Sequence, residues 1–197
     1  MTSRPRTQQR AGRIRQVLSK RQKDLTLVIN NIHDPHNVSA ILRSCDAFGI
    51  FRVHLLYTSN VFPALGKKSS ASAMKWVEKV NHAGVPDMVG SLGDQGFQLV
   101  RTGFSPGAVP VHEWDFTQPT AVILGNEHSG VEADLRDVVE QEIYIPMQGM
   151  VQSLNVSVAG AIILYEAFRQ RNMAGLYSHP SFSSLEIEAY FEKWIER

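Results

Sequence analysis

Short apolar runs alternate along this chain with segments of helical spacing, and the alternation continues for most of its length. Runs rich in apolar and β-branched residues predict strands at 25–29, 53–57, 76–80, 97–102, 120–124 and 143–145. Apolar residues at helical spacing predict helices at 35–48, 86–95, 131–138, 154–173 and 184–194. Strands that alternate with helices are typical of an α/β domain with a mostly parallel sheet.

The helix that follows the first strand has clear start and stop signals. Asp34 suits the capping position, Pro35 suits the first helical position, and Gly49 ends the helix. Asn37 and Arg43 lie off the apolar stripe, so we expect both side chains to face away from the core. From spacing alone, each would be interpreted as an ordinary exposed polar residue. The stripe itself contains Val38, Ile41, Leu42, Cys45 and Phe48.

The helix that begins near residue 154 is apolar on nearly every side. Its apolar residues are Leu154, Val156, Val158, Ala159, Ala161, Ile162, Ile163, Tyr165 and Phe168. We therefore expect it to be buried on more than one side, in a large core or against a second subunit. It follows a strand that Pro146 ends and a loop that contains Gly149, and Ser153 or Asn155 can cap it. A capped helix N-terminus suits an anionic or polar ligand, although most strand–loop–helix turns bind nothing.

Length and composition narrow the classes of protein. At 197 residues the chain can form one domain with a sizeable core, or a compact domain with an appendage. No apolar run reaches the length of a membrane span, and the Arg-rich start lacks the apolar segment of a secretory signal. The single cysteine, Cys45, excludes an internal disulfide framework and a cysteine-based zinc site. These features predict a cytoplasmic enzyme of bacterial type.

Charge is distributed unevenly along the chain. The overall charge of +1 is the balance of +8 before Asp24 and −7 from Asp24 onward, because the first 23 residues contain eight Lys and Arg and no acid. A basic arm commonly holds nucleic acid by its phosphates, although a solvated, partly disordered tail has the same composition. Ile14, Val17 and Leu18 form a small apolar stripe, so we expect part of the arm to be a helix that docks or becomes ordered on RNA. The connection 58–73, with Lys67 and Lys68, is a second candidate for substrate contacts or a surface loop.

Three motifs identify a family that the chain resembles. The longest reads I-P-M-x-G-M-V-x-S-L-N-V-S-V-A at 145–159, and N-x-x-x-I-L-R at 37–43 and V-I-L-G-N-E-x-x-G at 122–130 precede it. On these motifs the chain resembles the SpoU, or TrmH, family of RNA 2′-O-ribose methyltransferases within the SPOUT superfamily. The longest motif is unusual, the three occur in the expected order, and the similarity covers about residues 24–175.

The resemblance implies a fold that general rules would not predict, because knotted chains are rare. Family members have a mostly parallel sheet flanked by helices and a deep C-terminal trefoil knot, which here would comprise about residues 122–171. The resemblance divides the chain into a basic N-terminal arm or helix for RNA at 1–23, a SPOUT methyltransferase domain at 24–175 and a helical C-terminal extension at 176–197. Family members act as homodimers with the active site built across the interface.

The implied reaction moves a methyl group from S-adenosylmethionine to a ribose 2′-oxygen and needs no metal. The positions that match the family's catalytic motifs are Asn37, Arg43, Glu127, Ser153 and Asn155. Backbone groups near Thr102, Gly125, Ile145 and Leu154 would hold the cofactor in the loops of the knot. The candidates for RNA contacts are Arg10, Arg13, Arg21, Arg169 and Arg171.

Arg43 matches the family residue that lies at the 2′-hydroxyl and is often assigned the role of base. A guanidinium has a pKa above about 12 and no acceptor atom while it is charged. We therefore expect Arg43 to position the hydroxyl and to stabilise developing oxyanion charge, with Asn37 orienting Arg43 or the ribose. The route of the proton stays open.

The identity of the RNA is less strongly specified. Similarity over S-A-I-L-R, V-Q-S-L-N-V-S-V-A and Y-E-A-x-R-Q-R-x-x-A-G-x-Y, with the short basic extension, favours the branch that methylates guanosine 18 in the tRNA D-loop. The alternatives are a sibling enzyme for ribosomal RNA or for the tRNA anticodon loop, and an RNA-binding protein that has lost catalysis. A nicotinamide-binding enzyme is less compatible, because no G-x-G-x-x-G follows the first strand.

Overall fold

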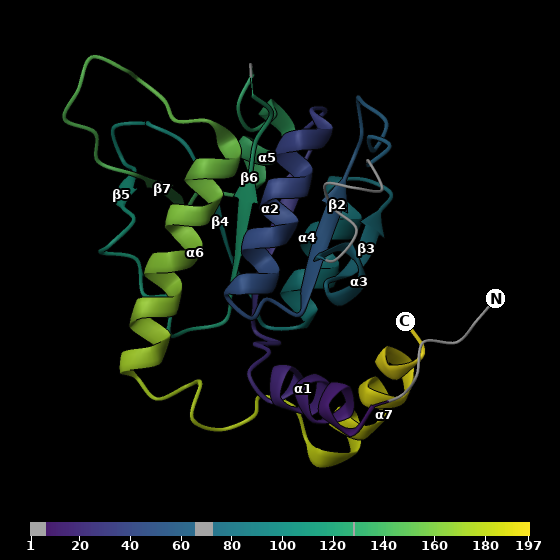
Figure 1. Cartoon of the computed structure of the whole chain (residues 1–197). Helices are drawn as coiled ribbons and strands as arrows, with labels where there is room; N and C mark the ends of the chain where they lie inside the picture. The colour runs from purple at the N-terminus through teal and green to yellow at the C-terminus, as the bar shows by residue number, and fades with distance from the viewer. Residues whose placement is uncertain (1–6, 66–72, 128) are drawn as a thin grey trace.

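The computed structural model describes residues 7–65, 73–127 and 129–197, and these form a seven-stranded sheet with flanking helices (Figure 1). The strand order is β3-β2-β1-β6-β4-β7-β5, and every pairing in it is parallel. The predicted α/β class with a mostly parallel sheet is therefore confirmed. The strands are β1 (Leu25–Asn30), β2 (Arg52–Leu56), β3 (Glu78–His82), β4 (Gln98–Thr102), β5 (Val109–Pro110), β6 (Thr120–Leu124) and β7 (Glu142–Tyr144).

Helices cover both faces of this sheet. On one face, α2 (Pro35–Ala47) packs beside α6 (Val156–Met173), and on the other lie α4 (Val85–Asp94) and α5 (Ala133–Val138) (Figure 1). The central strands β1 and β6 are buried on both faces, which explains their continuous apolar sequences. Their side chains alternate between two core clusters, so that Leu27 packs under α2 and α6 while Val28 packs under α4 and α5.

The two ends of the chain pack together as a separate layer at one end of the sheet (Figure 1). α1 (Gln8–Leu18) contacts α7 (Ser184–Ile195), and Leu18 and Trp194 are both buried in their common cluster. Ser183 and Glu186 form a capping box at the start of α7. The prediction that part of the basic arm is helical is confirmed, and the apolar face of α7 packs in the cluster that it shares with α1. Residues 1–6 of the arm lie outside the described residues.

Strand β7 enters the sheet between β4 and β5, the two strands that precede β6 in the chain. Its partners are Arg101 and Thr102 of β4 on one side and Val109 of β5 on the other. The chain then returns across the sheet so that α6 reaches α2. A strand that inserts between two earlier, directly connected strands is consistent with the predicted C-terminal knot.

The prediction of a strand at 76–80 is wrong in its first residues. A short helix, α3 (Ala73–Trp76), occupies the start of this segment, and β3 begins only at Glu78. Trp76 packs on Trp194 with ring centroids 5.2 Å apart, so its apolar character serves the terminal layer and not the sheet. The predicted substrate-contacting lysines Lys67 and Lys68 lie outside the described residues.

Two general features bear on function. In the described segments, none of the helices combines the length and the apolar character needed to cross a membrane. No three His, Cys, Asp or Glu side chains within 7–65, 73–127 and 129–197 are grouped so that they would hold a metal ion.

Candidate active site at the carboxyl end of the sheet

A cavity of about 510 Å³ opens where β4, β6 and β7 end and α6 begins. In open parallel sheets, ligands bind at this edge of the strands. All four positions proposed for the cofactor line the cavity, together with the catalytic candidates Glu127, Ser153 and Asn155. The cavity-lining residues are Thr102, Gly103, Phe104, Gly125, Asn126, Glu127, Gly130, Ile143, Tyr144, Ile145, Met147, Ser153, Leu154, Asn155, Val156, Ala159 and Ile163.

Gly125 begins a narrow loop at the wall of the cavity. Asn126 and Gly130 exchange backbone hydrogen bonds of 2.9 and 3.0 Å, which closes this loop. A Cβ atom at Gly125 would lie 2.2 Å from the carbonyl carbon of Gly130 and 2.3 Å from the backbone nitrogen of Val131. Because both neighbours are backbone atoms, only glycine allows this close approach.

A chain of hydrogen bonds joins the three sequence motifs beside the cavity. Asn37 donates from Nδ2 to Oε1 of Glu127 over 2.9 Å, and its Oδ1 accepts from Nδ2 of Asn155 over 3.0 Å. The backbone N–H of Asp34 donates to the same carboxylate oxygen over 3.4 Å. The interpretation of Asn37 as an ordinary exposed polar residue is wrong, because Asn37 is only 8% exposed and is covered by the two loops that it binds.

Asn155, and not Ser153, caps α6. Its Oδ1 accepts hydrogen bonds from the backbone N–H and the hydroxyl of Ser157 at 2.8 and 2.6 Å. These two donors fix the orientation of the Asn155 amide, which must then present its N–H₂ group to Asn37. Ser153 lies at the cavity wall, in the loop that precedes the cap. The cap therefore organises the helix terminus and the polar chain together.

The carboxylate of Glu127 is held in its ionised form. Burial raises its pKa, but the hydrogen bonds from Asn37, from its own backbone N–H and from Asp34, with the nearby His33, outweigh burial and lower the pKa overall. Its Oε2 atom is buried and has no hydrogen-bond partner among the described residues, although His33 Nδ1 lies 3.3 Å away and would pair with it when protonated. The site therefore presents a fixed negative charge, and one oxygen of this carboxylate accepts no hydrogen bond from the described residues.

Arg43 lies apart from this cavity. It is on the exposed side of α2 and is not among the residues that line the cavity. It lies six positions after Asn37, which corresponds to about 9 Å along the helix and about 120° around it. The structure thus brings together Asn37, Glu127, Ser153 and Asn155, and it leaves Arg43 on the neighbouring surface.

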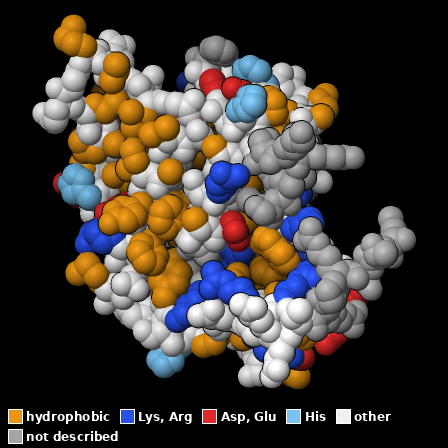
Figure 2. Space-filling model, viewed as in Figure 1, with side chains coloured by type: hydrophobic (Ala, Val, Ile, Leu, Met, Phe, Trp, Pro, Cys, Tyr) orange, Lys and Arg blue, Asp and Glu red, His pale blue; other side chains and the backbone are white. Residues whose placement is uncertain are grey.

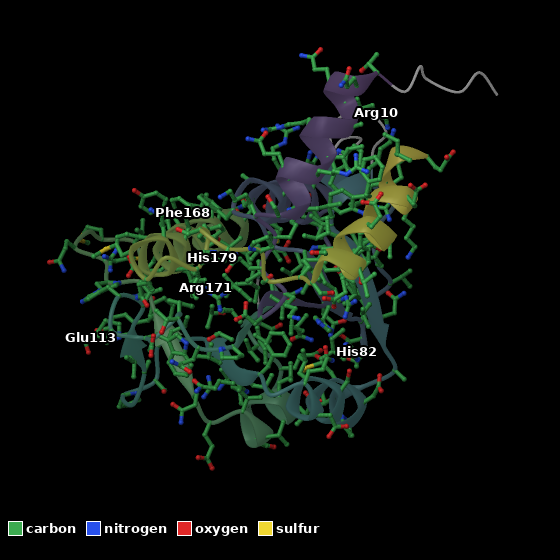
Figure 3. All side chains as sticks on the ribbon, turned by 90° about the horizontal axis from the view of Figure 1, so that it is seen from below. Arg10, His82, Glu113, Phe168, Arg171 and His179 are labelled. Carbon is green, nitrogen blue, oxygen red and sulfur yellow. The ribbon has the colours of Figure 1, made fainter. Side chains whose placement is uncertain are left out.

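The structure contradicts two of the five predicted RNA contacts. Arg21 and Arg171 are both 0% exposed, and their guanidinium groups are bound inside the protein to Asp46 and Asp24 respectively. Figure 3 shows Arg171 within the body, whereas Arg10 lies on α1 at the margin of the molecule. A buried, paired guanidinium cannot reach an RNA phosphate.

The remaining three arginines are accessible. Arg10 is partly exposed, Arg13 is exposed and donates to Gln16 over 2.9 Å, and both project from α1. Arg169 on α6 is 46% exposed in its side chain and pairs with Glu166 at 2.7 Å. Their roles in RNA binding stay predictions.

One structural feature of the cavity was not predicted from the sequence. Glu142, 3% exposed, forms an ion pair with Arg101 across the β4–β7 pair and accepts a 2.6 Å hydrogen bond from the backbone N–H of Ser105. A Cβ at Gly103 would lie 2.3 Å from the Glu142 carboxylate, so any larger residue there would displace this carboxylate from its position beside Arg101. The pair fixes the loop that carries Phe104 at the cavity wall. In the sequence, the only signal for this pair was an acid, Glu142, at the start of an apolar strand. Its partner Arg101 lies 41 positions earlier, so the signal did not reveal the pair.

Comparisons with known proteins agree with this geometry. The model of the SpoU rRNA Methylase family matches residues 24–165. The tRNA (guanosine(18)-2′-O)-methyltransferase of Aquifex aeolicus is 42% identical over 95% of this chain and 89% of its own length. The enzymes of that name from Escherichia coli and Thermus thermophilus are 44% and 41% identical, over 85% and 98% of this chain and 73% and 100% of their own lengths.

Solved structures show the same fold. The crystal structure of the A. aeolicus TrmH/SpoU tRNA modifying enzyme matches with a TM-score of 0.86 and 41% identity over 95% of both chains. The SpoU methyltransferase AviRb from Streptomyces viridochromogenes, solved with the cofactor AdoMet, matches with a TM-score of 0.67 and 27% identity, over 79% of this chain and 62% of its own. The family model covers more than half of the sequence. This chain therefore belongs to the SpoU methylase family.

Proposed function

We propose that this protein transfers the methyl group of S-adenosylmethionine to the ribose 2′-oxygen of guanosine 18 in the D-loop of tRNA. The observation that carries the proposal is the hydrogen-bonded chain of Glu127, Asn37 and Asn155, which joins all three motifs at the cavity. The identity of 41–44% with enzymes of this named activity, over 85–98% of the chain, supports the choice of substrate. A tRNA-modifying enzyme would work in the cytoplasm.

The residues of the cavity suit S-adenosylmethionine. Its walls combine apolar side chains such as Ile145, Leu154 and Ile163 with backbone groups at Gly125 and Gly103, where no side chain fits. Exposed peptide N–H and C=O groups recognise the edges of a nucleobase and a ribose, while the apolar surfaces bury their faces. When bound, the cofactor supplies a sulfonium methyl group that is already activated for transfer.

The chain's own residues have the task of alignment. Asn155, fixed by Ser157, holds Asn37, and Asn37 in turn holds the carboxylate of Glu127, so the three polar groups form a rigid wall. A methyl transfer depends on in-line geometry, and a rigid polar wall restricts the angles at which a ribose can approach. The guanidinium of Arg43 would orient the 2′-hydroxyl and stabilise negative charge that develops on the hydroxyl oxygen.

We further propose that the protein works as a homodimer through α6. One face of this helix packs in the core with Gly160, Ile163 and Leu164, while the opposite face leaves apolar side chains exposed. The exposed residues Val158, Ile162, Tyr165 and Met173 recur at intervals of three, four and eight positions, and Figure 2 shows hydrophobic side chains gathered over this part of the surface. These exposed apolar residues, which share their helix face with Arg169, support an interface with a second copy.

The arm would contribute phosphate contacts. Arg10 and Arg13 project from α1, which is anchored to α7 through buried Leu18 and Trp194. Because α1 is anchored, the arm has a fixed position on the body. Its positive charges would therefore contact the same set of phosphates in each bound RNA. Arg169, on the same side of the sheet as α2, is the third candidate.

A methylation assay tests the proposal. Purified protein is incubated with S-adenosylmethionine and an unmodified tRNA transcript, and 2′-O-methyl nucleosides are mapped by mass spectrometry. We expect a methylated guanosine 18, and we expect Arg43→Ala to slow its formation by roughly a hundredfold while the cofactor still binds, the scale of a positioned catalytic group. Methylation of ribosomal RNA or of the anticodon loop would change the substrate, and the absence of any methylation would refute the enzymatic function.

A further inference from the structure

Asn31 has an unusual backbone conformation at the carboxyl end of β1. Its φ of 49° is the one positive φ among the non-glycine residues of the described chain, and the residue is only 1% exposed. Asparagine tolerates the left-handed region better than most residues because its short side chain can bond locally. Residues held in such conformations recur at functional sites, where the surrounding contacts stabilise them.

The side chain of Asn31 binds the start of the segment that follows β2. Its Oδ1 accepts hydrogen bonds from three successive backbone N–H groups, those of Thr58, Ser59 and Asn60, at 3.1, 3.3 and 3.2 Å. Its Nδ2 donates to the hydroxyl of Thr58 over 3.0 Å. One amide thus satisfies the turn that leaves β2.

The backbone of Asn31 binds the loop that follows β6. Its carbonyl oxygen accepts a 2.7 Å hydrogen bond from Nδ2 of Asn126, the residue directly before Glu127. The turn that Asn31 begins contacts Glu127 twice more, through the N–H of Asp34 at 3.4 Å and through His33 Nδ1 at 3.3 Å. The conformation of Asn31 therefore sets where this turn meets the Glu127 loop.

A second group holds the same turn from its other side. Glu132, the residue that precedes α5, accepts hydrogen bonds of 2.9 Å from the hydroxyls of both Thr58 and Ser59. Burial raises the pKa of Glu132, but these bonds and those from Asn30 and Asn31 lower it overall, so the acceptor stays ionised. The loops after β1, β2 and β6 are thereby joined at one edge of the sheet, beside the cavity.

We propose that Asn31 is a positioning residue for methyl transfer, which holds the Glu127 loop and the turn at 58–60 in register with the start of α2. The inference rests on the proposed function, because it assigns Asn31 a task in that reaction. Asn31 does not line the cavity and touches neither cofactor nor ribose. Its side chain acts through the turn at 58–60 and through Glu132, which joins that turn to the loop of Asn126 and Glu127 at the cavity wall. Its loss should therefore reduce kcat more than it weakens the binding of either substrate.

The test compares Asn31→Gly with Leu92→Ala. Glycine keeps the left-handed backbone and removes only the side-chain contacts, so the fold is retained. Leu92 is fully buried on α4, in the core cluster on the face of the sheet opposite α2, so Leu92→Ala controls for lost stability. The kinetic constants for tRNA and S-adenosylmethionine are measured for both variants. Hydrogen exchange of the amides at 58–60 is followed without substrate.

We expect Asn31→Gly to lower kcat at least tenfold, to change the KM of either substrate less than threefold, and to expose the amides of 58–60 to exchange. We expect Leu92→Ala to keep kcat within about twofold and to retain protection at 58–60. Unchanged protection at 58–60 in Asn31→Gly would overturn the inference, whatever the activity. Equal loss of kcat in both variants would reduce Asn31 to a general stabilising role. If the wild-type protein methylated no RNA, the proposed function would be refuted. The exchange experiment would remain valid, because it does not depend on that function.

Discussion

Arg171→Ala separates a structural role from RNA binding at a residue where sequence and structure disagree. The guanidinium donates five hydrogen bonds inside the protein, to the carbonyl oxygens of Phe116, Asp24 and Gln118 and to the side chains of Gln22 and Asp24. These bonds tie the last turn of α6 to the start of β1 and to the turn before β6. Arg171 is therefore expected to stabilise the fold and to contribute nothing to tRNA affinity.

The size of the effect follows from these contacts. Removal of one partner of a buried ion pair costs about 3–5 kcal/mol, chiefly because the other partner is left uncompensated. The side chain of Asp24 is 36% exposed, so water can solvate it, and the cost should lie near the lower end, about 3 kcal/mol. For a chain of this size, each kcal/mol shifts the melting temperature by about 2–4 °C. Arg171→Ala should thus melt about 6–12 °C below the wild type.

The assay pairs thermal unfolding with tRNA binding at about 20 °C, where both proteins are folded. Arg169→Ala is the matched control, because Arg169 is on the same helix but half exposed. It should leave the unfolding free energy within about 1 kcal/mol, since exposed ion pairs contribute little. It should also reduce the slope of log K against log salt by about one, the amount expected for the loss of one phosphate contact. Protein concentration is held constant, because the stability of an oligomer depends on it.

The result that would refute the reasoning is specific. Suppose that Arg171→Ala had the melting temperature of the wild type but bound tRNA more weakly, with a smaller slope of log K against log salt. The guanidinium would then have to reach a phosphate. The buried position of Arg171 would then not describe the protein in solution. If Arg171→Ala lost both stability and affinity, the salt dependence of binding would decide between the two causes. A smaller folded fraction leaves the slope of log K against log salt unchanged, whereas a lost phosphate contact reduces it.

Three further predictions concern the cavity and the α6 surface. Because the pKa of Glu127 is lowered in the folded protein, its stabilising effect should be complete above its ordinary pKa of about 4.3 and should decrease below it. The unfolding free energies of wild type and Glu127→Gln, measured by urea titration, should therefore converge between about pH 6 and pH 3. A difference that stays constant with pH would contradict this. Gly125→Ala should weaken S-adenosylmethionine binding at least tenfold by calorimetry, whereas Gly107→Ala, where a Cβ meets nothing within 4 Å, should not. Ile162→Asp should dissociate the proposed dimer in sedimentation experiments, while Leu185→Asp, 85% exposed on α7, should leave it intact.

The elements of the fold were predictable because their signals are local. The Asp34 cap, Pro35 at the first helical position and the apolar runs of β1 and β6 are each read from a few adjacent residues. The ends of strands were less predictable: Trp76 has an apolar side chain, but its partner is Trp194, which is 118 positions away. Periodicity cannot report such a contact.

The site was predictable only through the motifs of the family. Spacing placed Asn37 on the outer side of its helix, yet loops from 127 and 155 cover it. Charge likewise predicted that Arg21 and Arg171 would be exposed, because arginine is almost never fully buried unless it is paired. Their partners Asp46 and Asp24 lie 25 and 147 positions away, so only the folded chain reveals the pairing.

The separation of Asn37 and Arg43 on α2 indicates how the site is completed. A single chain already assembles the cavity and its polar wall, since Glu127, Asn37 and Asn155 are bonded to one another. Arg43 lies outside that assembly, on the exposed side of α2 and away from the cavity wall. In the proposed reaction Arg43 contacts the ribose, so the RNA or a second subunit would have to bridge the distance between Arg43 and the cofactor cavity. Under this proposal, cofactor binding should depend on one chain alone, whereas methyl transfer should also need the RNA or the second subunit.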